Sequence, residues 1–234
     1  RDLHSFPTRR SSDLVVGDMG KKRRIVLWLL MLLILSGLFF LKQGISLKHY
    51  ANVDNGWNLI LVNKNNYIPK NYEFELTELS NGEKVDSRIY PSLQKMFDAA
   101  RVHGLSLRVS AGYRSEEAQQ QLMEEKIEAF ELEGHSSREA KRMAEKWVAV
   151  PGTSEHQIGI AVDINADRYA ASPTLYSWLA KNSYKYGFIQ RYPPDKNSVT
   201  GISYEPWHYR YVGKEAATEM HSRGLCLEEY VDGL

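Results

Sequence analysis

Apolar residues recur at intervals of three and four in the segment that follows Pro91 and stops at Gly104. This spacing puts them on one face of a helix and predicts an amphipathic helix over residues 91–103. Four further segments have the composition and the boundary residues of helices: 116–132, Ser136 to about Val148, Ser172 to near Gly187, and 213–223 closed by Gly224.

A two-residue alternation, typical of strands, is clearest between Pro151 and Asp167, in PGTSEHQIGIAVDINAD. The even positions carry bulky Ile or Val from 158 to 164, whereas the odd positions carry glycine, alanine and Asp163. In a strand these two sets face opposite ways, so one face is a core face and the other is a floor of small residues beside a carboxylate. His156 lies just upstream, where it can turn toward that floor.

The segment YEPWHYRYVG, residues 204–213, alternates in the same way. If it forms a strand beside the first one, His208 completes a cluster with His156 and Asp163. Glu205 precedes His208 by three residues, with Pro206 fixing the backbone between them.

Shorter apolar runs at 57–63 (WNLILVN) and 105–109 (LSLRV) also predict strands. Strands and helices follow one another irregularly, without the repeated strand–helix–strand spacing of a doubly wound sheet. We therefore expect an α+β fold, a small and mainly antiparallel sheet flanked by helices.

The N-terminal part differs in composition from the rest. Residues 1–14, RDLHSFPTRRSSDL, are those that a sequencing adapter encodes in one reading frame, and we interpret 1–18 as a non-native leader; the alternative is a disordered native tail. Residues 19–42 contain MGKKRR and then a long apolar run, the order of an export signal.

The apolar run of 25–41 has the minimum length for crossing a membrane, because about 17 to 25 residues are needed. No small-residue cleavage site follows it, which favours an uncleaved, single-pass signal anchor in a bacterial cell membrane. The four basic residues before it predict a cytoplasmic N-terminus and an extracytoplasmic C-terminal part. Residues 43–56 are then a polar spacer, and 57–234 form one domain.

Charge and cysteine content limit the possible functions. The first 42 residues hold eight of the 30 basic and three of the 29 acidic residues, so the remainder holds 22 and 26 and has a net charge near −4. This balance argues against nucleic acid as a partner. The single cysteine, Cys226, excludes an internal disulfide and a cysteine-rich zinc site, so any metal must be held by histidine and carboxylate.

Two imidazoles and one carboxylate suit zinc, and three protein ligands leave a fourth position for water, as in catalytic sites. Zinc makes water more acidic, and a neighbouring carboxylate can accept its proton. Glu205 is the candidate general base. A His-x6-Asp spacing by itself is a weak signal, because such pairs are often structural.

The runs SEHQIGIAVD and EPWHY resemble the VanY type of D-alanyl-D-alanine carboxypeptidases, within the zinc peptidases that include lysostaphin-like enzymes and the hedgehog fold. The resemblance covers about residues 57–224. It implies one zinc ion bound by His156, Asp163 and His208, with Glu205 as catalytic base. It also implies the mixed α+β fold, with the site on the sheet.

A third segment, SAGYRSEEAQ at 110–119, is similar to the substrate-binding motif of that family, S-G-Y-R-S-x-x-x-Q. Ala111 departs from the motif as an inserted residue and puts the role of Ser110 in doubt. Arg114 suits a substrate carboxylate or a developing oxyanion, and the sequence does not decide between them. The candidate substrate contacts are Tyr113, Ser115, Gln119, Ser154 and Trp207; Ser115 is equally suited to cap a helix, and Ser154 to a turn.

The leading hypothesis is a monomeric zinc metallo-carboxypeptidase that removes C-terminal D-alanine from the stem peptides of peptidoglycan. An L,D-carboxypeptidase acting on tetrapeptide stems is the nearest alternative, because the motifs do not separate the two. A zinc-containing wall-binding module without catalysis is the alternative from another class, and the free carboxylate of Glu205 argues against it.

Overall fold

The computed structural model of the protein describes residues 24–32, 48–166 and 172–234. The chain divides into two compact units, Arg1–Leu47 and Lys48–Leu234. The second unit begins earlier than the domain start expected at Trp57, and Ala51 is buried in its core. His49 and Ala51 also form backbone hydrogen bonds with Tyr67, so this short segment packs with the domain.

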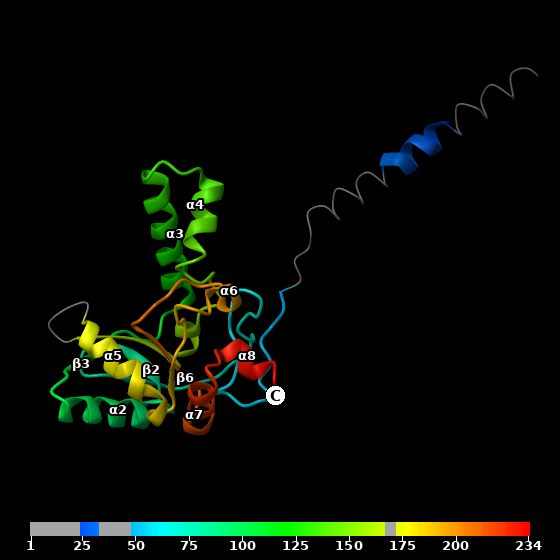
Figure 1. Ribbon diagram of the computed structural model, residues 1–234. Coiled ribbons are helices and arrows are strands. Elements are labelled where there is room, and N and C mark those ends of the chain that lie inside the picture. The colour runs from blue at the N-terminus through cyan, green and yellow to red at the C-terminus, as the bar shows by residue number, and fades with distance from the viewer. Residues whose placement is uncertain (1–23, 33–47, 167–171) are drawn as a thin grey trace, which may run out of the picture. The chain divides into compact units, whose positions relative to one another are not determined.

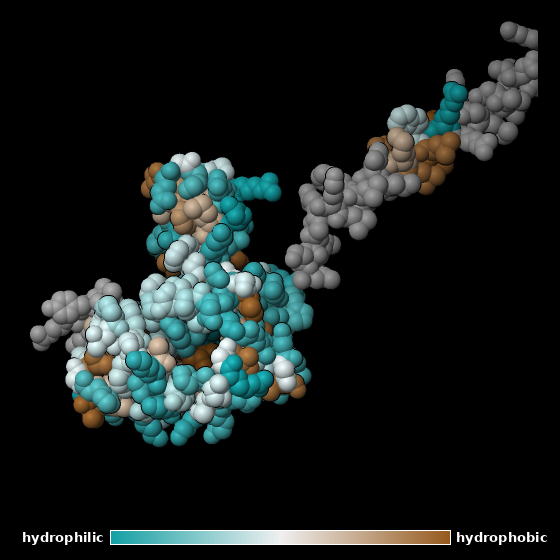
Figure 2. Space-filling model, viewed as in Figure 1, coloured by the Kyte–Doolittle hydropathy of each residue, from teal (hydrophilic) through white to brown (hydrophobic). Residues whose placement is uncertain are grey.

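In the first unit, residues 24–32 are helical and carry exposed apolar side chains (Figure 2). Within the described ranges, no helix combines the length and the apolar content that a membrane crossing requires. The predicted leader, 1–18, and most of the predicted anchor, 19–42, lie outside the described residues.

The second unit mixes short strands with helices (Figure 1). In chain order its elements are β1 Leu76–Glu78, β2 Lys84–Asp86, α2 Tyr90–Val102, β3 Leu107–Ala111, α3 Glu116–Leu132, α4 Ser137–Ala144, η1 Glu155–Ile158, β4 Ala161–Ala166, α5 Pro173–Asn182, η2 Ser183–Tyr186, β5 Phe188–Gln190, α6 Asn197–Thr200, β6 His208–Tyr211, α7 Lys214–Arg223 and α8 Leu227–Val231.

The central sheet has four strands in the order β3-β4-β6-β5, and each neighbouring pair is antiparallel. Strands β1 and β2 form a separate antiparallel hairpin. The predicted α+β class, with a small antiparallel sheet flanked by helices, is confirmed. So are the predicted helices α2, α3 and α7, whose observed bounds lie within one residue of the expected ones.

One face of the sheet packs on the main core. Ile160, Val162 and Ile164 are fully buried against α2 and α5, as the alternation predicted. Full burial of each such side chain is worth about 1.5 to 3 kcal/mol, so this face fixes the orientation of β4. A shift of one residue would reverse every side chain, so Asp163 must face the other side.

Helices α3 and α4 project from the body of the unit as an antiparallel pair (Figure 1). Each begins at a serine whose hydroxyl accepts a hydrogen bond from a backbone N–H, Ser115 from Ala118 and Ser136 from Glu139. Met123 and Ala144 pack between the two helices. The base of this pair lies beside the site described below.

The predicted strand at 57–63 is wrong. Ile60 and Val62 are buried as expected, but the segment pairs with no strand among the residues that the structure describes; it has a single isolated bridge, from Asn63 to Asn66. The guanidinium of Arg210 instead donates to the carbonyl oxygens of Asn58 and Ile60, at 3.1 and 2.7 Å. A buried side chain therefore satisfies the backbone groups that a neighbouring strand would otherwise bind.

Two predicted helices are shorter than expected. Helix α4 ends at Ala144 and not near Val148, and α5 ends at Asn182, after which η2 continues to Tyr186. Gly187 then closes η2 in the left-handed conformation, with φ of 86°. The predicted end near Gly187 thus marks the end of a 3₁₀ turn.

Candidate metal centre and active-site cleft

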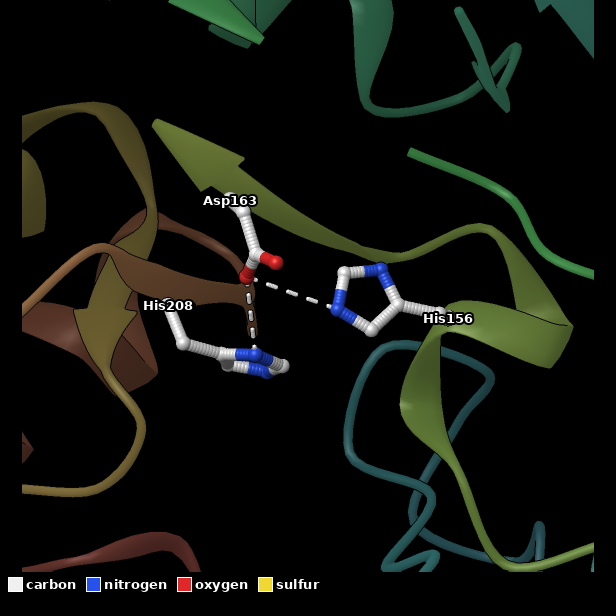
Figure 3. A group of neighbouring side chains, drawn as sticks. All are labelled: His156, Asp163 and His208. Carbon is white, nitrogen blue, oxygen red and sulfur yellow. Dashed lines mark ion pairs between the residues drawn. The ribbon is translucent and has the colours of Figure 1, made fainter. Parts of the chain in front are cut away.

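Three separate elements bring His156, Asp163 and His208 together (Figure 3). His156 lies in η1, Asp163 in β4 and His208 at the start of β6. Asp163 and His208 are direct partners in the antiparallel register, so the pairing itself places one beside the other. The structure therefore confirms the predicted adjacency of the two strands.

The ligand atoms converge on one carboxylate oxygen. Asp163 Oδ1 lies 3.1 Å from His208 Nδ1 and 3.5 Å from His156 Nε2. This oxygen is buried and makes no hydrogen bond within the described part of the chain. An anionic oxygen facing two imidazole nitrogens is the donor set of a divalent cation, so the residues present fit zinc.

A hydrogen bond to the backbone fixes the orientation of the His156 ring. Its Nδ1 lies 2.7 Å from the carbonyl oxygen of Gly112, which makes Nδ1 the protonated nitrogen and leaves Nε2 for a metal. Gly112 needs to be glycine because a Cβ there would lie 2.2 Å from the carbonyl oxygen of Lys84. The glycine of the SAGYR segment thus supports a metal ligand indirectly.

The extra residue of that segment forms a β-bulge. The register of β3 against β4 shifts between Val109 and Ala111, so Ser110 has no direct partner. Ser110 Oγ donates to the backbone oxygen of Asp163 and accepts from the amide of Asn165. The residue whose role the sequence left in doubt therefore ties β3 to the strand that carries a metal ligand.

The charges at the metal centre shift the pKa values of its groups. Burial alone would raise the pKa of Asp163, but His156 and His208 outweigh it and hold the pKa well below its usual range. Burial alone would lower the pKa of His208, but the carboxylates of Asp163 and Glu155 raise it to about 9. In the absence of a metal, the neighbouring carboxylates therefore favour the protonated, positively charged form of His208.

Glu205 lies next to the ligands, with Oε2 3.6 Å from His208 Nδ1. A turn positions it, since the N–H of His208 donates to the carbonyl oxygen of Glu205. The side chain is almost fully buried, and this burial raises its pKa to about 7 despite the nearby charge of His208. A carboxyl group with this pKa can accept and return a proton near neutral pH.

Arg114 lies on another wall of the same cleft. Its backbone N–H donates to the carbonyl oxygen of His156, and its Nη1 donates to Gln119 Oε1 at 2.8 Å. Burial lowers the pKa of Arg114, although Asp163 lies close enough to counteract that effect in part. Arg114 thus supplies a positioned cation beside the ligands.

Three of the predicted substrate contacts line the cleft: Gln119, Ser154 and Trp207. Gln119 is only 1% exposed, and both ends of its amide are used, one by Arg114 and the other by the carbonyl oxygen of Ala149. It holds Arg114 in place and offers little surface to a substrate.

Tyr113 and Ser115 do not line this cleft. The ring of Tyr113 packs 5.8 Å from that of Phe74 on the wall of another pocket, and Ser115 caps α3. The side chains on either side of Arg114 in the sequence thus point away from this cleft, and a contact between either of them and the substrate stays a prediction.

The cleft has a volume of about 440 Å³ and is lined in part by α3 and by the segment that follows α4. Sequence reasoning missed several of its lining residues: Leu122, Lys126, Val148, Ala149 and Ile202. They come from segments without a recognisable motif, so no sequence signal marked them. Lys126 and Trp147 lie beside each other, with Nζ 5.7 Å from the ring centroid.

Comparison with known proteins relates this chain to a family of carboxypeptidases. The family model "VanY: D-alanyl-D-alanine carboxypeptidase" matches residues 82–214, more than half of the chain. A D-alanyl-D-alanine carboxypeptidase of Enterococcus faecalis is 58% identical over 177 residues, which cover 75% of this chain and 66% of the relative. The chain thus spans about two thirds of that relative's length.

Three solved structures are similar. A vancomycin-resistance D,D-pentapeptidase VanY variant in complex with Zn(II) and VanYB in complex with D-alanine-D-alanine both have a TM-score of 0.73 and 58% identity, covering 75% of this chain and 99% and 98% of theirs. The LD-carboxypeptidase LdcB has a TM-score of 0.60 and 36% identity, covering 74% and 84%.

These comparisons confirm the predicted enzyme class and cofactor. A relative at 58% identity binds Zn(II), and His156, Asp163 and His208 form the candidate zinc site of this chain. The chain belongs to the VanY family of zinc-dependent D-alanyl-D-alanine carboxypeptidases.

Proposed function

We propose that this chain removes the C-terminal D-alanine from peptidoglycan stem peptides ending in D-Ala-D-Ala, with Glu205 as general base. One observation carries the assignment: a nearly buried carboxylate with a pKa of about 7 lies 3.6 Å from a nitrogen of the metal-ligand set. A purely structural metal site has no use for such a group.

His156, Asp163 and His208 would hold the zinc ion, through Nε2, Oδ1 and Nδ1. Bound zinc supplies Lewis acidity and increases the acidity of water. Glu205 accepts the proton of the attacking water and delivers it to the nitrogen of the departing D-alanine. Its burial in the cleft keeps its pKa close to the working pH.

Arg114 binds a negatively charged group of the substrate, either the terminal carboxylate or the oxyanion that forms during attack. Gln119 holds the guanidinium from one side, so the remaining N–H groups are available to the cleft. Ser154 and Trp207 line the same cleft and are the candidate contacts to the peptide.

A Glu205→Gln variant tests the role of the base. It keeps the shape of the side chain but cannot accept the proton, so we expect kcat to fall about 10²- to 10⁴-fold. Release of D-alanine from a muramyl pentapeptide, followed by mass spectrometry, gives the rate. Zinc content should stay at one ion per chain, and an exposed Glu219→Gln variant should behave like the wild type. Wild-type kcat in the Glu205→Gln variant would reject this assignment.

L,D-carboxypeptidase activity is the second candidate, and one finding favours it: the LD-carboxypeptidase LdcB shares the fold at 36% identity. VanYB in complex with D-alanine-D-alanine and the D-alanyl-D-alanine carboxypeptidase of Enterococcus faecalis are more similar to this chain than LdcB is, at 58% identity. Parallel incubation with tetrapeptide and pentapeptide stems separates the two activities. Binding of both stems without product would instead support the wall-binding module without catalysis.

We further propose that residues 19–42 anchor the chain in a bacterial cell membrane, with the catalytic unit outside the cytoplasm. The basic residues before the apolar run support this orientation. Protease accessibility of the unit in intact spheroplasts tests it. We also propose that the chain acts as a monomer, because one chain supplies the whole ligand set and cleft wall. Light scattering of the detergent-solubilised protein would measure its mass.

A further inference from the structure

The side chain of Glu155 lies behind the metal centre and has no role in the reaction described above. It precedes the ligand His156 in sequence, but its carboxylate is fully buried and lies near the other imidazole, His208. We propose that Glu155 is a positioning residue, which accepts a hydrogen bond from His208 Nε2–H and so orients this ligand for zinc. This inference rests on the proposed function, because it assumes that His208 binds the metal.

The two oxygens of Glu155 have different surroundings. Oε1 accepts from Arg191 Nε at 2.8 Å and from Arg210 Nη1 at 2.6 Å. Oε2 lies 3.8 Å from His208 Nε2. Glu155 Oε2 and His208 Nε2 are both buried, and neither atom has a hydrogen-bond partner in the part of the chain that the structure describes. An unpaired buried acceptor therefore faces an unpaired buried ring nitrogen, and each is the natural partner of the other.

The proton on His208 follows from the position of its other nitrogen. Nδ1 faces Asp163 Oδ1 at 3.1 Å, so Nδ1 is the nitrogen available to the metal. Nε2 then carries the proton and can donate it to Glu155. Metal-binding histidines generally donate their second nitrogen to a carboxylate or a carbonyl in this way. His156 has the carbonyl version, because its Nδ1 lies 2.7 Å from Gly112 O.

Glu155 is held firmly enough to orient another side chain. Arg191 also binds Glu228 through both terminal nitrogens, at 2.8 and 2.7 Å, and Arg210 donates to three backbone carbonyl oxygens. The two arginines and two glutamates balance in charge. The position of Oε2 is therefore set by a buried network and not by the metal.

Two matched substitutions distinguish an effect of Glu155 on the orientation of His208 from a general effect of the buried charge network on folding. Glu155→Gln and Glu228→Gln each remove one negative charge from a partner of Arg191, but only Glu155 lies near His208. The zinc affinity of the full chain in detergent, measured by competition with a chromophoric chelator, is the readout. We expect Glu155→Gln to weaken zinc binding about 10- to 100-fold and Glu228→Gln to change it less than about threefold.

Equal weakening in both variants would mean that the network acts only through folding and would overturn the proposal, as would unchanged affinity in Glu155→Gln. If Glu155→Gln fails to fold, nitrogen-15 spectra of histidine in the zinc-loaded wild type decide. We expect one histidine with Nδ1 ligation and a slowly exchanging Nε2–H. A His208 Nε2–H that exchanges at the solvent rate would reject the hydrogen bond. Neither measurement needs turnover, so failure of the proposed function is detected separately by the peptide assay.

Discussion

Two buried glutamates flank His208 at nearly equal distances, Glu155 behind the metal ligands at 3.8 Å and Glu205 on the cleft side at 3.6 Å. Burial by itself would raise the pKa of both carboxyl groups. For Glu155 the charges of Arg191 and Arg210 outweigh burial, and its pKa lies well below the usual range. For Glu205 the opposing charges are too weak, and its pKa rises to about 7.

The difference shows how one residue type serves two purposes within one site. Two arginines donate hydrogen bonds to Glu155 and keep it ionised, so its carboxylate has a fixed position and a fixed charge. Among the described residues no arginine or lysine donates a hydrogen bond to Glu205, and Arg114 acts on it only through its charge. Glu205 can therefore exchange its proton near neutral pH, as a general base must. The number of cations bound to each carboxylate thus distinguishes the glutamate that positions a ligand from the glutamate that exchanges a proton. Substitutions around each of them test this distinction.

The largest effect is expected at the carboxylate that both histidines share. Asp163→Asn keeps the size of the side chain but removes the charge that faces His156 and His208. Since the donor set then loses its only anionic ligand, we expect zinc to be lost on dialysis and D-alanine release to fall at least about 10³-fold. Zinc content by mass spectrometry and the peptide assay measure both. Retention of a full zinc equivalent would contradict the assigned ligand set.

The next effect concerns the network behind the ligands. Arg191→Leu leaves the carboxylates of Glu155 and Glu228 buried without one of their cations. Such a loss costs about 3 to 5 kcal/mol, which urea denaturation would record as a lower free energy of unfolding.

The control for this change is Arg223→Leu, which breaks an exposed pair with Glu219 and should cost less than about 1 kcal/mol. Equal costs in the two variants would show that the buried network is not stabilised by its charge balance.

Periodicity in the sequence predicted the part of the site that lies on strands. The alternation around Asp163 and around His208 predicted both strands, and for the strand of Asp163 it also predicted the face that packs on the core. The observed register places these two residues opposite each other. The amphipathic helices were also predictable, because glycine and proline mark their ends. The hairpin of β1 and β2 was missed although Asn81 and Gly82 form a turn signal in its loop.

Tertiary contacts could not be predicted in the same way. Glu155 meets Arg191 and Arg210 across 36 and 55 residues of chain. Arg210 lies in an alternating segment, but the alternation does not show that this charged side chain is buried. The segment 57–63 was misassigned for the same reason, because Arg210 takes the place of a neighbouring strand. What sequence reasoning lacked was knowledge of which charged side chains are buried.

A smaller effect on stability is expected for Glu205→Gln, which should stabilise the fold, whereas Arg191→Leu should destabilise it. The pKa of Glu205 is raised in the folded protein, so its protonated form stabilises the fold below about pH 4.5, and this contribution is lost as pH rises through about 7. Glu205→Gln avoids the loss. In metal-free protein we expect the variant to be more stable than the wild type by about 1 to 3 kcal/mol at pH 8 and nearly equal at pH 4.5.

Thermal and urea unfolding at both pH values, with a chelator present, measure this difference. If the free energies of unfolding of the two proteins differ by the same amount at both pH values, burial does not raise the pKa of Glu205 to about 7. A more stable but less active variant would show directly that the base is kept at a cost to the fold.

The smallest effect is expected at the open end of the cleft. Lys126 lines the cleft on the side of α3 and is only partly buried, so water screens its charge, unlike the charges behind the ligands. A carboxypeptidase substrate is anionic, and a screened charge contributes about 0.5 to 1 kcal/mol to binding. We expect Lys126→Ala to raise KM about two- to fivefold with kcat unchanged, because the contact is the same in the ground state and the transition state. Lys126→Arg keeps the charge and should keep the KM. A fall in kcat at constant KM would instead place Lys126 with Glu205 among the groups that act on the reacting bond.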